Sequence, residues 1–207
     1  MVIAQIQGCI KTLEKIVYDY EVAQFADQPA KRKTVALVIG HREGSPGAVN
    51  RRSGVTEFSY NSMLADDIRV LLPDLDVKII YRSTYKKLPG LINGYDPDLV
   101  ISLHCNAFNQ QATGTETLYY HRSSTGKRMA SILQGKLVDA LGLANRGIKS
   151  KRSEDRGGYL LRYTDAPCII AEPFFIDNDG DFKTASINRD ELIQAYAGAI
   201  SEMAAVI

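Results

Sequence analysis

Short apolar runs that alternate with helical stretches constrain this chain more than any other feature of its sequence. Runs of six or seven residues recur from Thr34 onward, a length that suits buried strands. The strand-like runs are residues 34–40, 76–82, 99–104, 115–120 and 167–172, and the helical stretches are residues 56–72, 124–141 and 192–203. This alternation predicts an α/β fold, with a mostly parallel twisted sheet flanked by helices.

Residues 1–30 have a different pattern. Apolar side chains repeat there at alternating steps of three and four residues, namely Ile3, Ile6, Ile10, Leu13, Val17 and Tyr20. This stripe predicts an amphipathic helix, which we expect to dock on its own domain of a monomer. Self-association and partner binding are the alternatives, although fewer than three heptads make a weak coiled coil. The segment 28–33, QPAKRK, is typical of a linker, so we expect a helix and linker at residues 1–30 and one larger domain at residues 31–207.

The composition excludes several classes of protein. Lys and Arg number 25 and Asp and Glu 24, so the net charge of +1 lacks the basic footprint of a nucleic-acid-binding protein. Cys9, Cys105 and Cys168 lack CxxC spacing and are expected to be free thiols. No run approaches the roughly 20 apolar residues of a membrane span. Gln5 and Gln7 interrupt the apolar core that an export signal would need, so we expect synthesis in the cytoplasm.

Histidines directly follow two of the strand-like runs. His41 follows the run that ends at Gly40, and His104 follows LVISL. Parallel strands bring such residues to the carboxyl edge of a sheet, where open α/β folds bind ligands. Glu57, in the first turn of a helix that Thr56 or Ser53 could cap, can return to the same edge. Two imidazoles and one carboxylate suit a catalytic zinc ion, since the fourth tetrahedral position stays open for water or substrate.

A zinc hydrolase also needs a base that takes a proton from water. Glu172 ends the run PCIIAE and would lie at the same edge of the sheet, so we expect it to be that base. His121 lies in a polar stretch and is interpreted as a surface residue. Glu116 either orients a ligand or is a strand-end charge, and the sequence leaves both possibilities open.

Motifs around these residues follow one another in a distinctive order. They are Gly40-His41 with Gly47-Ala48, Glu57 with Asn61, the set Ser102, His104, Asn106 and Ala107, the set Gly114, Glu116, Tyr119 and Tyr120, and the set Glu172, Phe175, Ile176 and Asn178. In this order they resemble the type 3 family of N-acetylmuramoyl-L-alanine amidases, from about Val35 to the end of the chain. The resemblance implies zinc ligands at His41, Glu57 and His104 and a catalytic Glu172.

The resemblance also implies a substrate and a reaction. Such an enzyme cuts peptidoglycan at the amide between N-acetylmuramic acid and the L-alanine of the stem peptide. Because the chain shows neither an export signal nor wall-binding repeats, it looks like an endolysin that reaches the cell wall after release. A zinc peptidase that cuts within the stem peptide is one alternative. A wall-binding module without catalysis is another, and the intact Glu172 argues against it.

Overall fold

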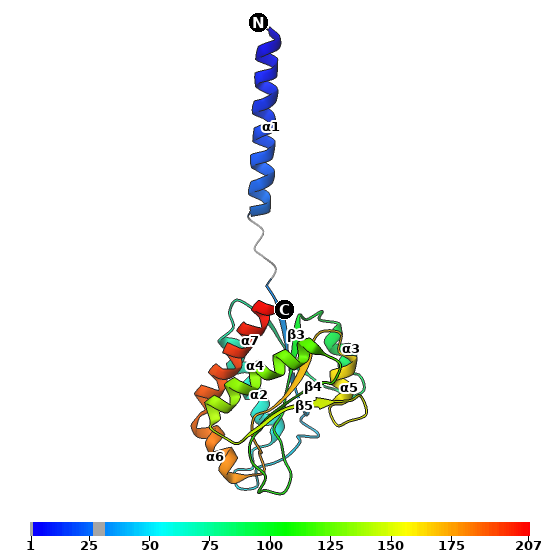
Figure 1. The fold of residues 1–207 in the computed structure, drawn as a ribbon, viewed down its shortest axis with the longest axis vertical. Helices are drawn as coiled ribbons and strands as arrows, with labels where there is room; N and C mark the ends of the chain where they lie inside the picture. The colour runs from blue at the N-terminus through cyan, green and yellow to red at the C-terminus, as the bar shows by residue number, and fades with distance from the viewer. Residues whose placement is uncertain (1, 27–31) are drawn as a thin grey trace. The chain divides into compact units, whose positions relative to one another are not determined.

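The computed structural model describes residues 2–26 and 32–207, which belong to two compact units. The first unit contains helix α1 (Val2–Ala26). The second, Lys33–Ile207, contains a six-stranded sheet and the remaining helices (Figure 1). Within the described residues, every helix is too short or too polar to cross a membrane.

The six strands form one mixed sheet in the order β2-β1-β3-β6-β4-β5. Their bounds are β1 (Thr34–Ile39), β2 (Asp76–Tyr81), β3 (Leu99–Leu103), β4 (Thr115–Tyr120), β5 (Asn145–Lys151) and β6 (Cys168–Glu172). β2, β1, β3 and β6 are parallel, β4 is antiparallel to β6, and β5 is parallel to β4. The predicted α/β fold with a mostly parallel sheet is confirmed. The apolar pattern did not predict that β4 pairs with β6 in the antiparallel direction.

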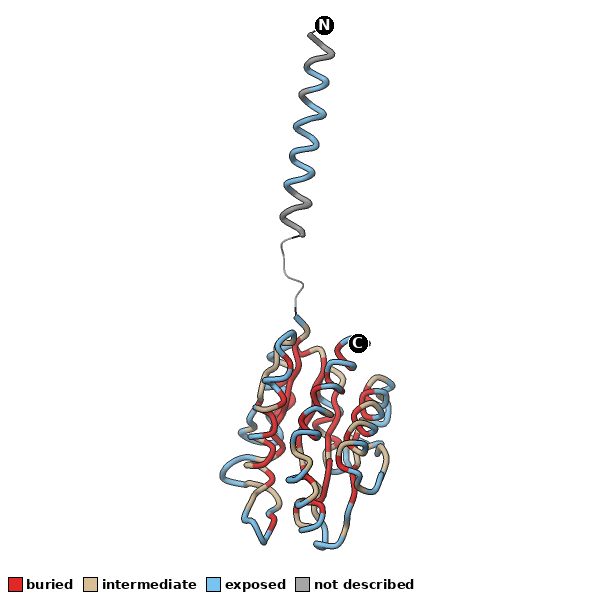
Figure 2. The backbone as a smooth tube through the Cα atoms, turned by 90° about the vertical axis from the view of Figure 1, so that its left-hand side faces the viewer, coloured by how far each residue is buried: buried red, intermediate tan, exposed pale blue. Residues whose placement is uncertain are grey.

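Helices cover both faces of this sheet (Figure 1). Their bounds are α2 (Glu57–Val70), α3 (Leu88–Asn93), α4 (Ser124–Leu141), α5 (Gly158–Tyr163), α6 (Asp179–Ile187) and α7 (Arg189–Val206). Residues of α2, α4 and α7 share one core with Val35, Leu37 and Ile39 of β1. Residues of α3 and α5 share a second core with Ala36 and Val38. Successive side chains of β1 thus point to opposite faces of the sheet, and because helices cover both faces the whole strand is buried (Figure 2).

The start of α2 is fixed by a capping box. The Thr56 hydroxyl accepts a hydrogen bond from the backbone N–H of Ser59, and the Ser59 hydroxyl accepts one from the backbone N–H of Thr56. These bonds satisfy amide groups that would otherwise lack partners at a helix start. Of the two predicted caps, Thr56 and Ser53, the structure has Thr56, which places Glu57 in the first turn of the helix.

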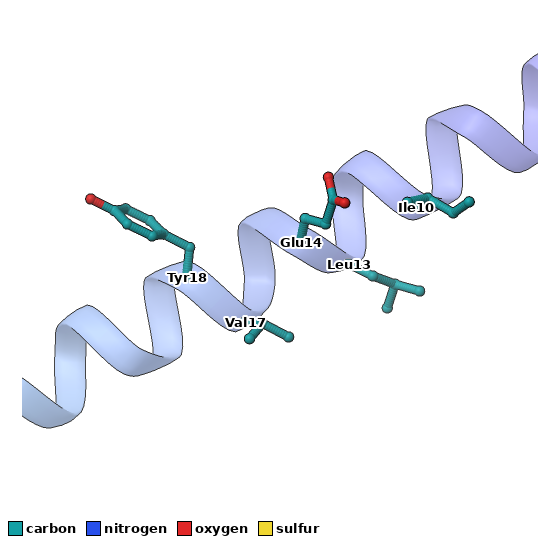
Figure 3. Close-up of a pocket in the computed structure, with 5 residues that line it drawn as sticks. All are labelled: Ile10, Leu13, Glu14, Val17 and Tyr18. Carbon is teal, nitrogen blue, oxygen red and sulfur yellow. The ribbon is translucent and has the colours of Figure 1, made fainter.

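Helix α1 carries the predicted apolar stripe. Ile10, Leu13 and Val17 of the stripe lie together, and Glu14 and Tyr18 flank them, so that the five side chains border one hollow on the helix surface (Figure 3). The apolar side chains are exposed in this unit, with Leu13 at 61%. Docking of the helix on the larger unit stays a prediction, as does the state of assembly. The predicted linker at residues 28–33 falls mostly outside the described residues.

Candidate metal and catalytic site

Two imidazoles meet at the carboxyl edge of the sheet because β1 and β3 end there side by side. Ile39, the last residue of β1, is paired with Leu103, the last residue of β3. The backbone N–H of Gly40 continues this pairing by donating to the carbonyl of Leu103 at 3.0 Å. His41 and His104 leave these neighbouring ends, and their ring centroids lie 5.5 Å apart with the rings at 74°.

Two glycines make room for this approach. A Cβ atom on Gly40 would lie 2.4 Å from Cε1 of His104, and one on Gly47 would lie 2.6 Å from Oε2 of Glu57. Gly47 also has a φ of +80°, a conformation that side-chain-bearing residues rarely adopt. The Gly-His and Gly-Ala motifs therefore have a steric reason, since any larger residue would displace an imidazole or the carboxylate.

Glu57 lies between the two imidazoles. Its Oε1 is 2.9 Å from Nδ1 of His104, and its Oε2 is 3.2 Å from Nε2 of His41. The backbone N–H groups of Cys105 and Ala48 donate to Oε1 and Oε2 at 3.0 and 3.3 Å. The residue is only 2% exposed. Each carboxylate oxygen of Glu57 therefore contacts one imidazole and one backbone N–H group, and these contacts fix its position.

The electrostatics favour the charged form of Glu57. Burial by itself raises the pKa of this carboxyl group, but hydrogen bonds and charge interactions with His104 and His41 outweigh burial and bring the pKa far below its ordinary value. The group is therefore an anion at neutral pH. An anionic oxygen beside two imidazoles is a donor set that binds divalent transition metals.

These three side chains could hold a metal ion. His41, Glu57 and His104 each offer one ligand atom, and the three atoms lie within 4.8 Å of one another. Both histidines are partly exposed, so an ion would remain reachable from solvent on one side. Three protein ligands with an open side are typical of catalytic metal sites, whereas structural sites are closed by four ligands.

Glu172 ends β6, which is the neighbour of β3. Its Oε2 atom is buried and has no hydrogen-bond partner within the described part of the chain. Burial, followed by the charge of Glu57, raises the pKa of the Glu172 carboxyl group well above its ordinary value. A buried carboxyl group whose pKa is raised in this way is a candidate for proton transfer in catalysis.

A cavity of about 600 Å³ opens over these residues. His41, His104 and Glu172 line it together, whereas the buried Glu57, which contacts both imidazoles, is not among the lining residues. The segment after β5 forms another wall through Ser153, Arg156 and their neighbours. The polar stretch at residues 150–158 therefore borders the cavity.

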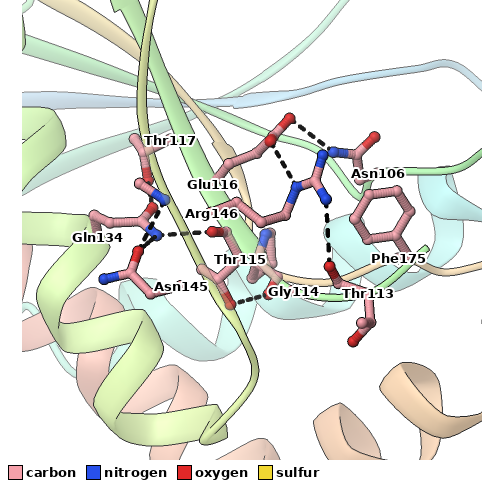
Figure 4. Close-up of polar contacts among 12 residues, drawn as sticks. Asn106, Thr113, Gly114, Thr115, Glu116, Thr117, Gln134, Asn145, Arg146 and Phe175 are labelled. Carbon is pink, nitrogen blue, oxygen red and sulfur yellow. Dashed lines mark hydrogen bonds and ion pairs between the residues drawn. The ribbon is translucent and has the colours of Figure 1, made fainter.

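Glu116 faces Glu172 across the antiparallel β4–β6 pair. Its Oε1 accepts a hydrogen bond from the side-chain amide of Asn106 at 2.9 Å, and its Oε2 accepts one from Nε of Arg146 at 2.8 Å (Figure 4). The Arg146 guanidinium group lies 5.0 Å from the centroid of the Phe175 ring. Glu116 thus fixes the amide of Asn106, which also lines the cavity. The sequence did not predict its pairing with Arg146.

The structure brings together the four residues that the sequence singled out for chemistry, His41, Glu57, His104 and Glu172, at one edge of the sheet. His121 is exposed and its ring lies against Tyr120, so its interpretation as a surface residue is confirmed. Sequence reasoning did not find the cavity residues Arg82, Tyr85 and Tyr159, because they come from loops and a short helix without a motif.

Comparison with known proteins is consistent with this site. The sequence model of the N-acetylmuramoyl-L-alanine amidase family matches residues 35–203. The N-acetylmuramoyl-L-alanine amidase LytC of Bacillus subtilis is 27% identical over 193 residues, which cover 87% of this chain and 38% of LytC. The uncharacterized protein YqiI of the same organism is 28% identical over 183 residues, which cover 84% of each chain.

Solved structures share the fold. The crystal structure of an N-acetylmuramoyl-L-alanine amidase from Clostridium difficile 630 superposes with a TM-score of 0.73 at 22% identity, over 84% of this chain and 97% of the other. The match of the family model extends over the whole sheet and includes the four residues at its carboxyl edge. This chain therefore belongs to the N-acetylmuramoyl-L-alanine amidase family.

Proposed function

We propose that this protein hydrolyses the amide between N-acetylmuramic acid and the L-alanine of the stem peptide, and so acts on the bacterial cell wall. The observation that carries the proposal is the convergence of a His-Glu-His cluster with Glu172 around one cavity, in a chain that belongs to an amidase family. The cavity is open enough to admit part of a polymer, since exposed loops form much of its wall.

His41, Glu57 and His104 are the proposed zinc ligands. Two nitrogen donors and one carboxylate oxygen fit zinc, and the buried position of Glu57 holds all three donors close together. A bound zinc ion supplies a Lewis acid for the scissile carbonyl and lowers the pKa of water. The chain itself contributes the rigid arrangement, because strand ends, a capped helix start and two glycines fix the three side chains.

Glu172 is the proposed general base and acid. It takes a proton from the attacking water while the water oxygen bonds to the carbonyl carbon of the lactyl group. The carbon–nitrogen bond then breaks, and Glu172 returns the proton to the alanine nitrogen. The products are a lactyl carboxylate on the sugar and a peptide with a free amino group. The Oε2 atom of Glu172, which has no hydrogen-bond partner among the described residues, and the raised pKa of this group both suit a side chain that accepts and then returns a proton.

Mass spectrometry of digested peptidoglycan tests this proposal. Amidase activity yields peptide-free glycan strands and stem peptides that begin with a free L-alanine. A peptidase that cuts within the stem leaves the first alanine attached to the sugar, and that result would contradict the proposal. A parallel digestion with a chelator is expected to yield neither product, because removal of the metal removes the Lewis acid.

A further inference from the structure

The cavity is lined by carboxylates that already have partners in the protein. Apart from Glu172, each acidic side chain of the lining accepts at least one hydrogen bond. The bonds join Glu116 to Nε of Arg146 at 2.8 Å, Glu154 to the Ser153 hydroxyl at 2.9 Å, and Asp155 to the backbone N–H of Arg152 at 2.7 Å. Glu116 is thus paired with a cation, whereas Glu154 and Asp155 accept hydrogen bonds from neutral groups of their own loop.

Three cationic side chains also line this cavity. Arg82 follows β2, Lys151 ends β5, and Arg156 lies between β5 and α5. Within residues 2–26 and 32–207, no carboxylate forms an ion pair with any of these three side chains. The Arg82 guanidinium group instead lies 5.8 Å from the centroid of the Tyr85 ring. Cationic side chains that line a cavity and are not engaged in a close ion pair can bind an anionic group of a ligand, although Glu116, Glu154, Asp155 and Glu172 line the same cavity.

Two of these cations, Arg156 and Lys151, influence the pKa of the proposed catalytic residue Glu172. Burial and the charge of Glu57 dominate the raised pKa of Glu172, while the charges of Arg156 and Lys151 oppose them. Both cations are therefore close enough to Glu172 to influence it electrostatically. Arg82, Lys151 and Arg156 line the same cavity as Glu172, so an anionic group bound by them would lie in the cavity where the reaction is proposed to occur.

We infer that Arg82, Lys151 and Arg156 bind free carboxylate groups of the stem peptide. The inference rests on the proposed function and states which stem peptides the enzyme would prefer. N-acetylated sugars offer neutral hydroxyl and amide groups, whereas a stem peptide carries carboxylates at its glutamyl residue and at its C-terminus. Arginine donates paired N–H groups to a carboxylate in a geometry that a neutral amide cannot match. The cations therefore favour a stem with free carboxyl groups over an amidated stem.

Binding of synthetic stem tripeptides to the full chain tests this preference without requiring turnover. Isothermal titration calorimetry compares a tripeptide with free carboxyl groups and its fully amidated twin. The variants are Arg156→Gln and Lys151→Gln, with Arg156→Lys as the charge-retaining variant. Arg152→Gln is the matched control, because this exposed arginine lies in the same loop but does not line the cavity.

The wild type is expected to bind the free peptide about 10-fold to 100-fold more tightly than the amidated one, which is the usual effect of hydrogen bonds to charged groups. Arg156→Gln and Lys151→Gln should each reduce the ratio of the two affinities, free peptide over amidated peptide. Arg156→Lys should reduce this ratio less, and Arg152→Gln should leave it unchanged. Equal binding of both peptides by the wild type would overturn the inference, as would an unchanged ratio in both Gln variants. Failure of the enzyme to cut peptidoglycan would instead count against the proposed function, because peptide binding is measured separately.

Discussion

Replacement of Glu172 by Gln separates proton transfer from metal binding. The substitution keeps the shape of the side chain but removes the group that accepts a proton. We expect turnover on peptidoglycan to fall by about 10²–10⁴-fold, the usual contribution of a positioned acid–base group. This loss corresponds to roughly 3–5 kcal/mol in the activation free energy. Zinc content is expected to stay at the wild-type level, because Glu172 is not among the three clustered ligand atoms.

The structure also sets the direction of the stability change. The pKa of Glu172 is raised in the folded protein, so the free energy of unfolding of the wild type falls as the pH rises through the interval above the ordinary value of 4.5. A Gln side chain does not ionise, so the variant does not lose stability in this way as the pH rises. Thermal denaturation at neutral pH should therefore show Glu172→Gln to be as stable as the wild type or more stable.

The assay combines rates with metal analysis on the same samples. Glu191→Gln is the control, because this exposed glutamate lies in the first turn of α7, away from the cavity. It should retain activity within about twofold of the wild type, since surface substitutions of this kind have small effects. A Glu172→Gln variant that lost its zinc, or one that kept full turnover, would refute the assignment of Glu172 as the base.

Three further predictions concern the ligands, the glycines and α1. Glu57→Gln should weaken zinc binding by at least about tenfold in a metal titration and regain activity in excess zinc, because a neutral amide is a poorer donor; unchanged zinc affinity would contradict this. Gly40→Ala should abolish zinc binding, since its Cβ would lie 2.4 Å from the His104 ring, whereas the control Gly135→Ala meets nothing within 4 Å; equal zinc contents would disprove the steric argument. Deletion of residues 1–30 should spare the zinc site, and either the melting temperature or the number of chains per particle measured by sedimentation should fall, according to whether α1 docks or self-associates. If neither changed, both interpretations of α1 would be wrong.

Residues at the ends of buried strands could be predicted from the sequence, because a buried strand is a recognisable run of apolar residues. β1, β3 and β6 are buried strands, so their ends could be located in the sequence, and His41, His104 and Glu172 are found there. Glu57 was predictable because Thr56 marks a helix start. Residue types at strand and helix ends thus identified the cluster, although their roles as ligands and base stay proposals.

The remaining features depend on contacts that a local pattern does not contain. β5 is the polar edge strand NRGIKSK, and it lacks the apolar run that revealed the other strands. The antiparallel direction of β4 cannot be deduced from alternation, since both directions give the same period. Helices α3 and α5 have six residues each, too few for a clear periodicity. The cavity residues Arg82 and Arg156 converge only after these elements pack.

Zinc add-back to chelated protein, followed by analysis of the peptidoglycan fragments, tests the central claim most directly. We predict that metal-free protein is inactive and that release of stem peptides with free N-terminal L-alanine rises with bound zinc up to about one ion per chain, as expected for three ligands around one ion. The same titration of a His104→Ala variant should release none. Release of these peptides at the full rate by metal-free protein, or zinc-dependent cleavage that leaves L-alanine on the sugar, would contradict the account.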